Sequence, residues 1–189
     1  MATRPTAPPD PPLTDGVVAL RQWTDTDVPA LLAALNDEML ARWLDQLPQP
    51  YTDADARAYV AFGRRGWRSE EHETPFAIAD AATDEPLGSL GVRWADELEG
   101  VAELGYWVGR DARGRGVATR ATRLVARWVL ADVGFERLEL RADPQNVASC
   151  RVAERAGFTL DGTLRSIRVN RRLGRRIDLR VYSLLRDEL

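Results

Sequence analysis

The chain has 189 residues, 44% of them hydrophobic and 29% charged, which is the composition of one globular domain with a core of its own. Its net charge of −3 argues against general attraction to nucleic acid or to an anionic membrane surface. One cysteine cannot form an internal disulfide, and together with one histidine it argues against a zinc or haem site.

No apolar run approaches the roughly 18 residues that cross a bilayer, and the chain start lacks a secretory signal pattern. We therefore expect a cytoplasmic protein that uses no metal and has no membrane partner. Residues 1–12 contain five of the eleven prolines and few apolar side chains, which predicts a flexible, extended arm. Residues 13–189 are then expected to form a single domain.

Hydrophobic spacing and capping residues predict the elements of the first half of the chain. β-Forming residues over 17–21 predict a first strand, and residues 24–27 supply caps for a helix that follows. Further elements come in order: a short helix over 37–44, a helix capped by Thr52, and strands over 74–80 and 87–94 joined by a turn. The single histidine, His72, lies in a polar stretch, Glu-Glu-His-Glu, that predicts a solvated turn.

The stretch from residue 103 to residue 119 organises the rest of the chain. Residues 101–109 predict a strand, and the loop after it contains Gly114 and Gly116, which let the backbone approach another group closely. From Val117 apolar residues recur at helical spacing to about residue 131, so a helix begins there. Unpaired N–H groups and the helix dipole, beside Arg113 and Arg115, predict an anion site, and a pyrophosphate fits it best.

Three kinds of glycine loop compete for this pattern. A nucleoside-triphosphate loop is excluded because Gly-Lys-Ser/Thr is missing and the chain contains no lysine. The dinucleotide fingerprint fails at its third glycine, where Thr119 stands. Residues 113–118, Arg-Gly-Arg-Gly-Val-Ala, resemble instead the Arg/Gln-x-x-Gly-x-Gly/Ala loop of the GCN5-related N-acetyltransferases (GNAT), which grips the pyrophosphate of coenzyme A.

Three later pieces extend the resemblance: Asp-Pro-Gln-Asn-Val-Ala-Ser over 143–149, Glu-Arg-Ala-Gly-Phe over 154–158, and Asp-Leu-Arg-Val-Tyr-Ser-Leu-Leu over 178–185. Their order and intervals resemble the RimJ/RimL branch of this family, whose best known members acetylate protein N-termini. The resemblance implies an α/β (α+β) fold: a mixed, mostly antiparallel sheet of about seven strands, splayed between strands 4 and 5 and flanked by helices. The local pattern predicts a strand over 136–142, a helix over 147–156 ended by Gly157, and a final pair of strands.

The family resemblance also implies acetyl-CoA, or another acyl-CoA, as co-substrate. Main-chain groups of Trp107 and Val108 would bond to pantetheine as an added strand segment does. The residues implied in cofactor binding are Trp107, Val108, Arg113, Gly114, Arg115, Gly116, Val117, Ala118, Thr119, Asn146 and Ser149. Asn146 also stands where a helix N-cap is expected, and the two roles are compatible.

Direct transfer needs a neutral amine, so a carboxylate has to accept the proton of the amine. Glu103 is the candidate, since it lies on the strand beside the thioester; the alternative is a structural carboxylate paired with an arginine across the sheet. Ser149 is the candidate proton donor to the leaving thiolate. RimL-type enzymes are thought to use a carboxylate after the last helix, where this chain has Arg165, Arg168 and only Asp161. That departure argues against the ribosomal-protein role.

Two surfaces of the expected acceptor site allow two interpretations each. Trp43, Leu47, Tyr51 and Trp67 either line the acceptor pocket, as this segment does in the family, or pack the helices onto the sheet. Seven arginines between residues 165 and 180 form either a solvated hairpin or a site for an acidic group, such as the free carboxylate of succinyl-CoA. Cys150 is expected to be structural.

The sequence thus predicts an acyl-CoA-dependent N-acyltransferase that moves acetyl to a primary amine, either a protein N-terminus or a small molecule. The alternatives are a succinyl-CoA-type acyltransferase, a non-catalytic acyl-CoA-binding protein, and an arginine-dependent binder of nucleic acid. The sequence does not choose the acceptor amine. Homodimers are common in this branch, so a homodimer is a further expectation.

Overall fold

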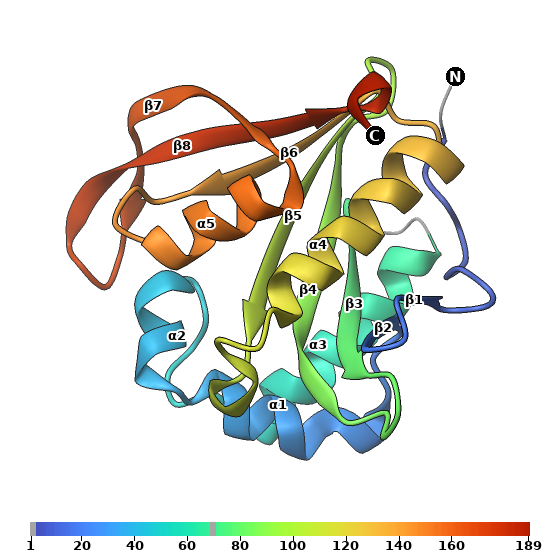
Figure 1. Ribbon diagram of the computed structural model, residues 1–189. Coiled ribbons are helices and arrows are strands. Elements are labelled where there is room, and N and C mark those ends of the chain that lie inside the picture. Colours follow the sequence, from blue (N-terminus) through green and yellow to red (C-terminus); the bar gives the residue numbers. More distant parts are fainter. Residues whose placement is uncertain (1–2, 69–70) are drawn as a thin grey trace.

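The computed structural model describes residues 3–68 and 71–189, and within them eight strands form one sheet in the order β1-β2-β3-β4-β5-β6-β8-β7 (Figure 1). Neighbouring strands are antiparallel except β5 and β6, which are parallel. The strands are β1 (Leu13–Thr14), β2 (Val18–Arg21), β3 (Glu73–Asp80), β4 (Pro86–Asp96), β5 (Val101–Val108), β6 (Arg137–Ala142), β7 (Thr159–Asn170) and β8 (Arg175–Leu185).

The two parallel strands pair over only part of their length. Residues 101–104 of β5 pair with residues 137–140 of β6, whereas β5 continues to Val108. Beyond these pairs the strands separate, as Figure 1 shows. The splay predicted between the strand before the glycine loop and the strand after its helix is therefore confirmed. The sheet has one strand more than expected, because Leu13–Thr14 pairs with β2.

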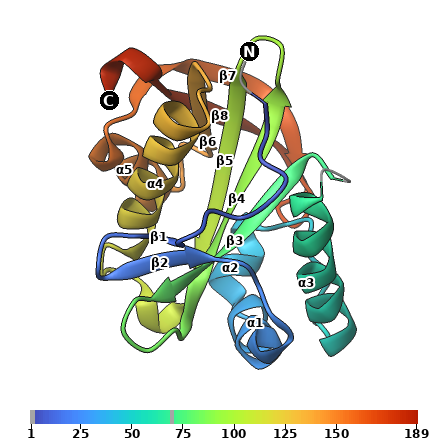
Figure 2. The same cartoon turned by 90° about the vertical axis from the view of Figure 1, so that its right-hand side faces the viewer.

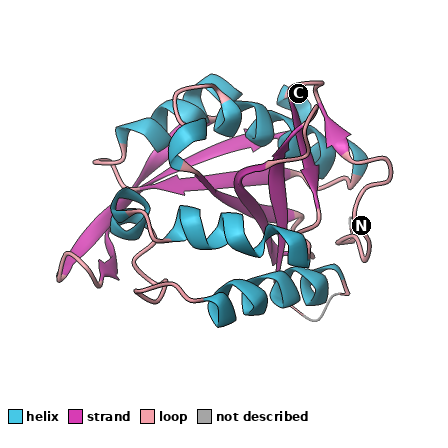
Figure 3. Ribbon diagram, turned by 90° about the horizontal axis from the view of Figure 1, so that it is seen from below, coloured by secondary structure: helices cyan, strands magenta, loops and turns pink. Residues whose placement is uncertain are grey.

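Helices cover both faces of the sheet. Figure 2 shows α1 and α3 on one side of the strands and α4 and α5 on the other, and Figure 3 shows the same layers from below. The bounds are η1 (Asp25–Asp27), α1 (Val28–Leu35), α2 (Glu38–Trp43), α3 (Asp53–Trp67), η2 (Arg110–Ala112), α4 (Val117–Arg127), the π turn η3 (Trp128–Asp132), α5 (Val147–Ala156) and η4 (Arg186–Glu188).

Local capping signals explain where several of these helices begin and end. The Thr52 side chain accepts a hydrogen bond from the Asp55 amide, and the Thr52 amide donates to Asp55 Oδ2 at 2.8 Å, which makes a capping box. Asn146 caps α5, and Gly157 ends it with φ = 99°, a left-handed conformation that favours glycine. The predicted caps at Thr52, Asn146 and Gly157 are thus confirmed.

Two apolar cores lie on the two faces of the sheet. Under α4 and α5, Phe76, Trp94 and Trp128 meet edge to face, with ring centroids 5.5 to 6.0 Å apart. Under α1 and α3, the core contains Leu31 and Val60, packed against the other face. The cysteine Cys150 is buried in the first core, as expected for a structural residue.

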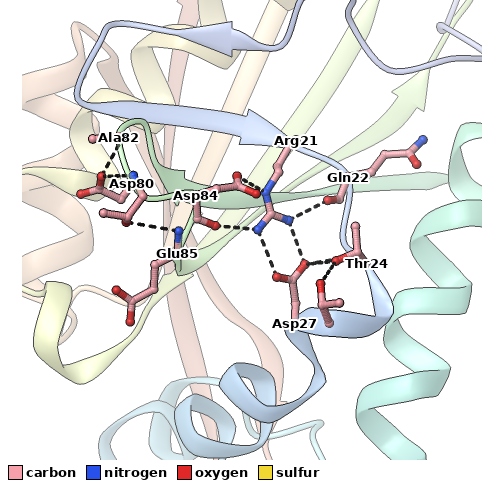
Figure 4. A network of polar contacts seen from close by, with 10 residues as sticks. Arg21, Gln22, Thr24, Asp27, Asp80, Ala82, Asp84 and Glu85 are labelled. Carbon is pink, nitrogen blue, oxygen red and sulfur yellow. Dashed lines mark hydrogen bonds and ion pairs between the residues drawn. The ribbon is translucent and has the colours of Figure 1, made fainter.

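A buried ion pair fixes the segment that leads from the sheet into α1. The Arg21 guanidinium, at the end of β2, donates to both carboxylate oxygens of Asp27 at 2.8 and 3.0 Å and to Asp84 in the β3–β4 turn (Figure 4). Although burial opposes it, hydrogen bonds from Arg21 and Thr24 hold the pKa of Asp27 below its usual range. The start of α1 is therefore connected to β2 and to the β3–β4 turn.

The N-terminal arm has no helix or strand over residues 3–12, and residues 1–2 of the predicted arm lie outside the described part. The Arg4 guanidinium donates to the Glu71 carbonyl at 2.7 Å, so the arm has a point of contact with the domain. Its flexibility stays a prediction. Among the described residues, no helix has both the length and the apolar character to cross a membrane.

Candidate active site

The glycine loop joins β5 to α4 and leaves the first turn of that helix open. Gly114 and Gly116 have φ values of 74° and 79°, in the left-handed region, where a side chain is disfavoured. Gly116 is the N-cap of α4 and provides no side chain to cap it. The N–H groups at the start of α4 therefore face outward with the positive end of the helix dipole, an arrangement that can bind an anion.

A cavity of about 430 Å³ lies between this loop, the end of β5 and the first turns of α5. Ten of the eleven residues predicted to bind a cofactor line it: Trp107, Val108, Arg113, Gly114, Gly116, Val117, Ala118, Thr119, Asn146 and Ser149. Arg115, between the two glycines, does not line this cavity. It lines a separate cavity beside α1. We call the first of these the cofactor cavity.

Arg113 is held by an aspartate that sequence reasoning did not single out. Its guanidinium donates to Asp37 Oδ1 at 2.8 Å and to the Val108 carbonyl at 3.2 Å, while Arg110 donates to Asp37 Oδ2. Asp37 also caps α2 by accepting from the Leu40 amide. Despite burial, the hydrogen bonds from Arg113, the Leu40 amide and Arg110 keep the pKa of Asp37 well below its usual range. The glycine loop and α2 are thereby joined.

Ser149 has a partner on the opposite wall of the cofactor cavity. The Tyr106 hydroxyl donates to Ser149 Oγ at 3.1 Å, and the Ser149 amide donates to Asn146 Oδ1 at 3.2 Å. Burial raises the pKa of Tyr106 to about 12, so it stays protonated and can keep donating. Tyr106 was missed from the sequence; its place near the end of the strand, beside the expected splay, was the available signal.

Glu103 lies in the same region but is held by two arginines. Arg93, its cross-strand neighbour on β4, forms an ion pair with Glu103, and Arg141 Nε lies 3.3 Å from Glu103 Oε2. The carboxylate also lines a cavity of about 320 Å³ together with Ser149. The cross-sheet pairing proposed as the structural alternative is present, and the catalytic role of Glu103 stays a prediction.

The comparisons with known proteins agree with this geometry. A family model described as an acetyltransferase (GNAT) domain matches residues 18–159. The chain belongs to the GNAT acetyltransferase family. The uncharacterized N-acetyltransferase p20 of Bacillus licheniformis is 26% identical over 171 residues, which cover 90% of this chain and 94% of that protein.

Two further matches are to ribosomal-protein acetyltransferases. The ribosomal-protein-serine acetyltransferase of Escherichia coli is 28% identical over 82 residues, 43% of this chain and 46% of that protein. The solved structure of RimL, a ribosomal L7/L12 α-N-protein acetyltransferase in complex with coenzyme A, gives a TM-score of 0.76 at 21% identity, covering 94% of this chain and 98% of that one. The chain is thus an acyltransferase of the GNAT family that is similar in sequence and fold to these proteins.

On the other side of β5 this GNAT domain has a second cavity, of about 420 Å³, which we call the acceptor cavity. Gly91 and Gly105 pair across β4 and β5 and form its floor. Trp43 and Leu47 line this cavity, which agrees with the interpretation that they belong to the wall of the acceptor pocket. The remaining walls include Leu44, Tyr59, Trp107 and Arg168.

The other two candidates for the acceptor wall, Tyr51 and Trp67, belong to the core instead. Tyr51 is buried among α1 and α3 and donates its hydroxyl to the Asp55 carbonyl at 3.2 Å. Trp67, at the end of α3, packs on Phe76 and Trp128. For these two residues the acceptor role is wrong, because each ring is enclosed by neighbouring elements before it can reach the cavity.

The polar stretch around His72 also differs from expectation. His72 lies in an exposed bend, as predicted, but Glu73 begins β3 and enters the acceptor cavity. Glu70 lies outside the described residues. The prediction of a solvated turn is therefore wrong for Glu73, because strand pairing with β4 turns this side chain inward.

The arginine-rich segment is the hairpin of β7 and β8, and several of its arginines bind other parts of the chain. Arg168 donates to the buried Asp45 at 2.6 Å, and Asp45 also accepts from the Arg171 amide at 2.7 Å. Arg175 donates to Gln145 at 3.0 Å. These contacts fasten the hairpin to the loops after α2 and β6, so part of its charge is used within the domain.

Proposed function

We propose that the protein moves an acetyl group from acetyl-CoA to a primary amine by direct attack. The observation that carries this proposal is that the two cavities adjoin. Trp43, Leu44 and Tyr106 line both the cofactor cavity and the acceptor cavity. A thioester in the first cavity and an amine in the second would therefore meet at the end of β5.

The residues around the cofactor cavity fit an acyl-CoA. The open start of α4, between the left-handed Gly114 and Gly116, suits the diphosphate. Trp107 and Val108 lie beyond the last β5–β6 pair, so this edge of β5 has room for pantetheine, and the Val108 carbonyl there also accepts from Arg113. The RimL neighbour solved with coenzyme A supports the same donor class.

The acceptor amine has to lose a proton before it attacks the thioester carbon, and the leaving thiolate has to gain one. We assign the first step to Glu103, which lines a cavity together with Ser149. We assign the second to Ser149, whose oxygen is oriented by the Tyr106 hydroxyl and whose own proton points away from that bond. Asn146 holds the Ser149 backbone at the start of α5.

The acceptor is a protein N-terminus or a small-molecule amine. The names of the ribosomal-protein relatives support an N-terminus. Asp161, the acidic residue after α5, gives no further support for an N-terminal acceptor. Its carboxylate already accepts hydrogen bonds from Arg137 and from the Ser183 hydroxyl. We place the reaction in the cytoplasm, and we retain a homodimer as a prediction that size-exclusion chromatography with light scattering can test.

Acetyl is preferred over a dicarboxylic acyl group such as succinyl. Arg168, the arginine that lines the acceptor cavity, is paired with the buried Asp45, so it does not supply an unpaired charge for a second carboxylate. A succinyl-CoA-type enzyme would need such a charge close to the thioester.

Two measurements test the proposed function. Mass spectrometry of the purified protein identifies the acyl-CoA that copurifies with it, and thiol release in the presence of a panel of primary amines reports transfer. We expect acetyl-CoA as donor, amine-dependent thiol release, and a large loss of rate in Glu103→Gln. Thiol release that is the same with and without any amine would contradict the proposal.

A further inference from the structure

The acceptor cavity contains one carboxylate that has no direct ion-pair partner among the described residues. Among residues 3–68 and 71–189, three charged ones line this cavity: Asp45, Glu73 and Arg168. Asp45 and Arg168 form an ion pair with each other at 2.6 Å. Within the described part of the chain, the Glu73 carboxylate accepts no hydrogen bond and forms no ion pair. Of the charged side chains that line the cavity, Glu73 is therefore the one without a direct partner, and Arg93 acts on it without forming an ion pair.

Strand register explains how this carboxylate comes to lie in the cavity. Glu73, Arg93 and Glu103 are neighbours across β3, β4 and β5, and Arg93 is used by Glu103. The Glu73 side chain turns instead over Gly91, where a Cβ would lie 2.3 Å from Glu73 Oε1. The carboxylate therefore occupies the space that a side chain at position 91 would fill.

The space next to this carboxylate is open. Gly105 pairs with Gly91 across β4 and β5, and a Cβ on Gly105 would meet no atom within 4 Å. Aromatic rings also line the cavity: Tyr59 is held by a hydrogen bond to Ser89 at 2.9 Å, and Trp107 is a second lining residue. Burial raises the pKa of Glu73 against the opposing charge of Arg93, and the charge of Glu103 raises it further.

We propose that Glu73 is a specificity-determining residue that binds the acceptor in its protonated, ammonium form, over Gly105 and against the aromatic wall. An ammonium group would supply the charge and the hydrogen bonds that Glu73 lacks, and the rings of Trp107 and Tyr59 favour a cation as well. The proposal rests on the proposed function and narrows its substrate class. An acceptor with a carboxylate next to its amine would face Glu73, so amides and peptide N-termini are favoured over free amino acids.

The test uses the full chain with coenzyme A bound and two small probes, n-butylammonium and 1-butanol, which share a shape and differ in charge. Saturation-transfer NMR at neutral pH measures the affinity of each probe. We expect the wild-type chain to bind butylammonium at least about tenfold more tightly than Glu73→Gln does, since charge-assisted hydrogen bonds are lost. Glu73→Asp keeps the charge and is expected to restore part of that affinity.

A matched control makes the same change elsewhere. Glu99→Gln alters an exposed glutamate in the β4–β5 turn and is expected to bind both probes as the wild-type chain does. Equal affinity of wild type and Glu73→Gln for butylammonium would overturn the inference, and so would a wild-type chain that binds butanol as well as butylammonium. Failure of the proposed function is seen separately: a chain that binds the ammonium through Glu73 but releases thiol at the same rate with and without amines contradicts only the transfer reaction.

Discussion

A single pair of hydroxyl groups joins the strand side of the cofactor cavity to its helix side. Tyr106 comes from β5 and Ser149 from α5, and the two oxygens are 3.1 Å apart. Because the phenol donates, the serine proton is left to point elsewhere in the cavity. The position of that proton matters for a serine that is to protonate a thiolate.

Replacing Tyr106 by Phe removes this orientation and little else. We expect the turnover rate, measured as thiol release, to fall about tenfold, which corresponds to one hydrogen bond of about 1.4 kcal/mol. Coenzyme A affinity, measured by calorimetry, is expected to stay the same. Ser149→Ala is the control, and in the double variant the two losses should overlap rather than add. A Tyr106→Phe enzyme with the full rate would show that the serine needs no orientation.

Glu73 gives a second expectation, for stability. Burial raises the pKa of its carboxyl in the folded chain, so between the unfolded and the folded pKa the native state binds more protons. Folding stability due to this group is therefore highest below the unfolded pKa and is lost as the pH rises through the folded pKa. We expect Glu73→Gln to raise the melting temperature at neutral pH and to leave it unchanged in acid. Calorimetry at both pH values checks this, and a lower melting temperature at neutral pH would contradict it.

At the level of elements, α2 is held in place by the loop that is expected to bind the diphosphate. Asp37 is both the N-cap of α2 and the partner of Arg110 and Arg113. This short helix carries Trp43, which lines both cavities. Asp37 therefore connects the glycine loop directly to the helix that forms part of the acceptor wall.

Asp37→Asn removes the ion pairs with Arg110 and Arg113 but keeps a helix cap, since Asn is also a good N-cap. We expect the free energy of unfolding, measured in urea, to fall by about 2 kcal/mol at neutral pH, because two charge-assisted contacts are lost. The folded pKa of Asp37 is depressed, so this contribution is present above its unfolded pKa and disappears as the pH falls through the folded value. The control, Asp53→Asn, removes only an exposed pair with Arg57 and should cost about 0.5 kcal/mol at most.

The contrast between these elements explains what the sequence could predict. Thr52 and Gly157 act on groups a few residues away, so local spacing was enough to place them, and the glycine loop is local as well. Asp37, Tyr106 and Glu73 act through partners that lie far along the chain, or through space left by a neighbouring strand. No local pattern contains that information. Arg115 was assigned by its place in the loop, and its direction depends on the turn around it.

For the molecule as a whole, β5 is the boundary between two chemical tasks. Val108 lines the cofactor cavity, Gly105 lies in the floor of the acceptor cavity, and Trp107 between them lines both. Most of the fold serves to hold this strand between α4 and α5 on one face and the α1 and α3 layer on the other (Figure 2). One cavity can therefore be blocked while the other still binds its ligand.

Gly105→Val tests that separation. A Cβ at this position meets no atom within 4 Å, so the added methyl groups enter the acceptor cavity rather than the core. We expect the free energy of unfolding to stay the same or to rise by up to about 1 kcal/mol, because glycine weakens a strand interior. Amine-dependent thiol release is expected to fall at least about tenfold, the loss that corresponds to about 1.4 kcal/mol, and coenzyme A affinity to persist. Gly162→Val, the same change in β7, where a Cβ also meets no atom within 4 Å, is the control. Full transfer by Gly105→Val would show that the acceptor does not lie over this strand.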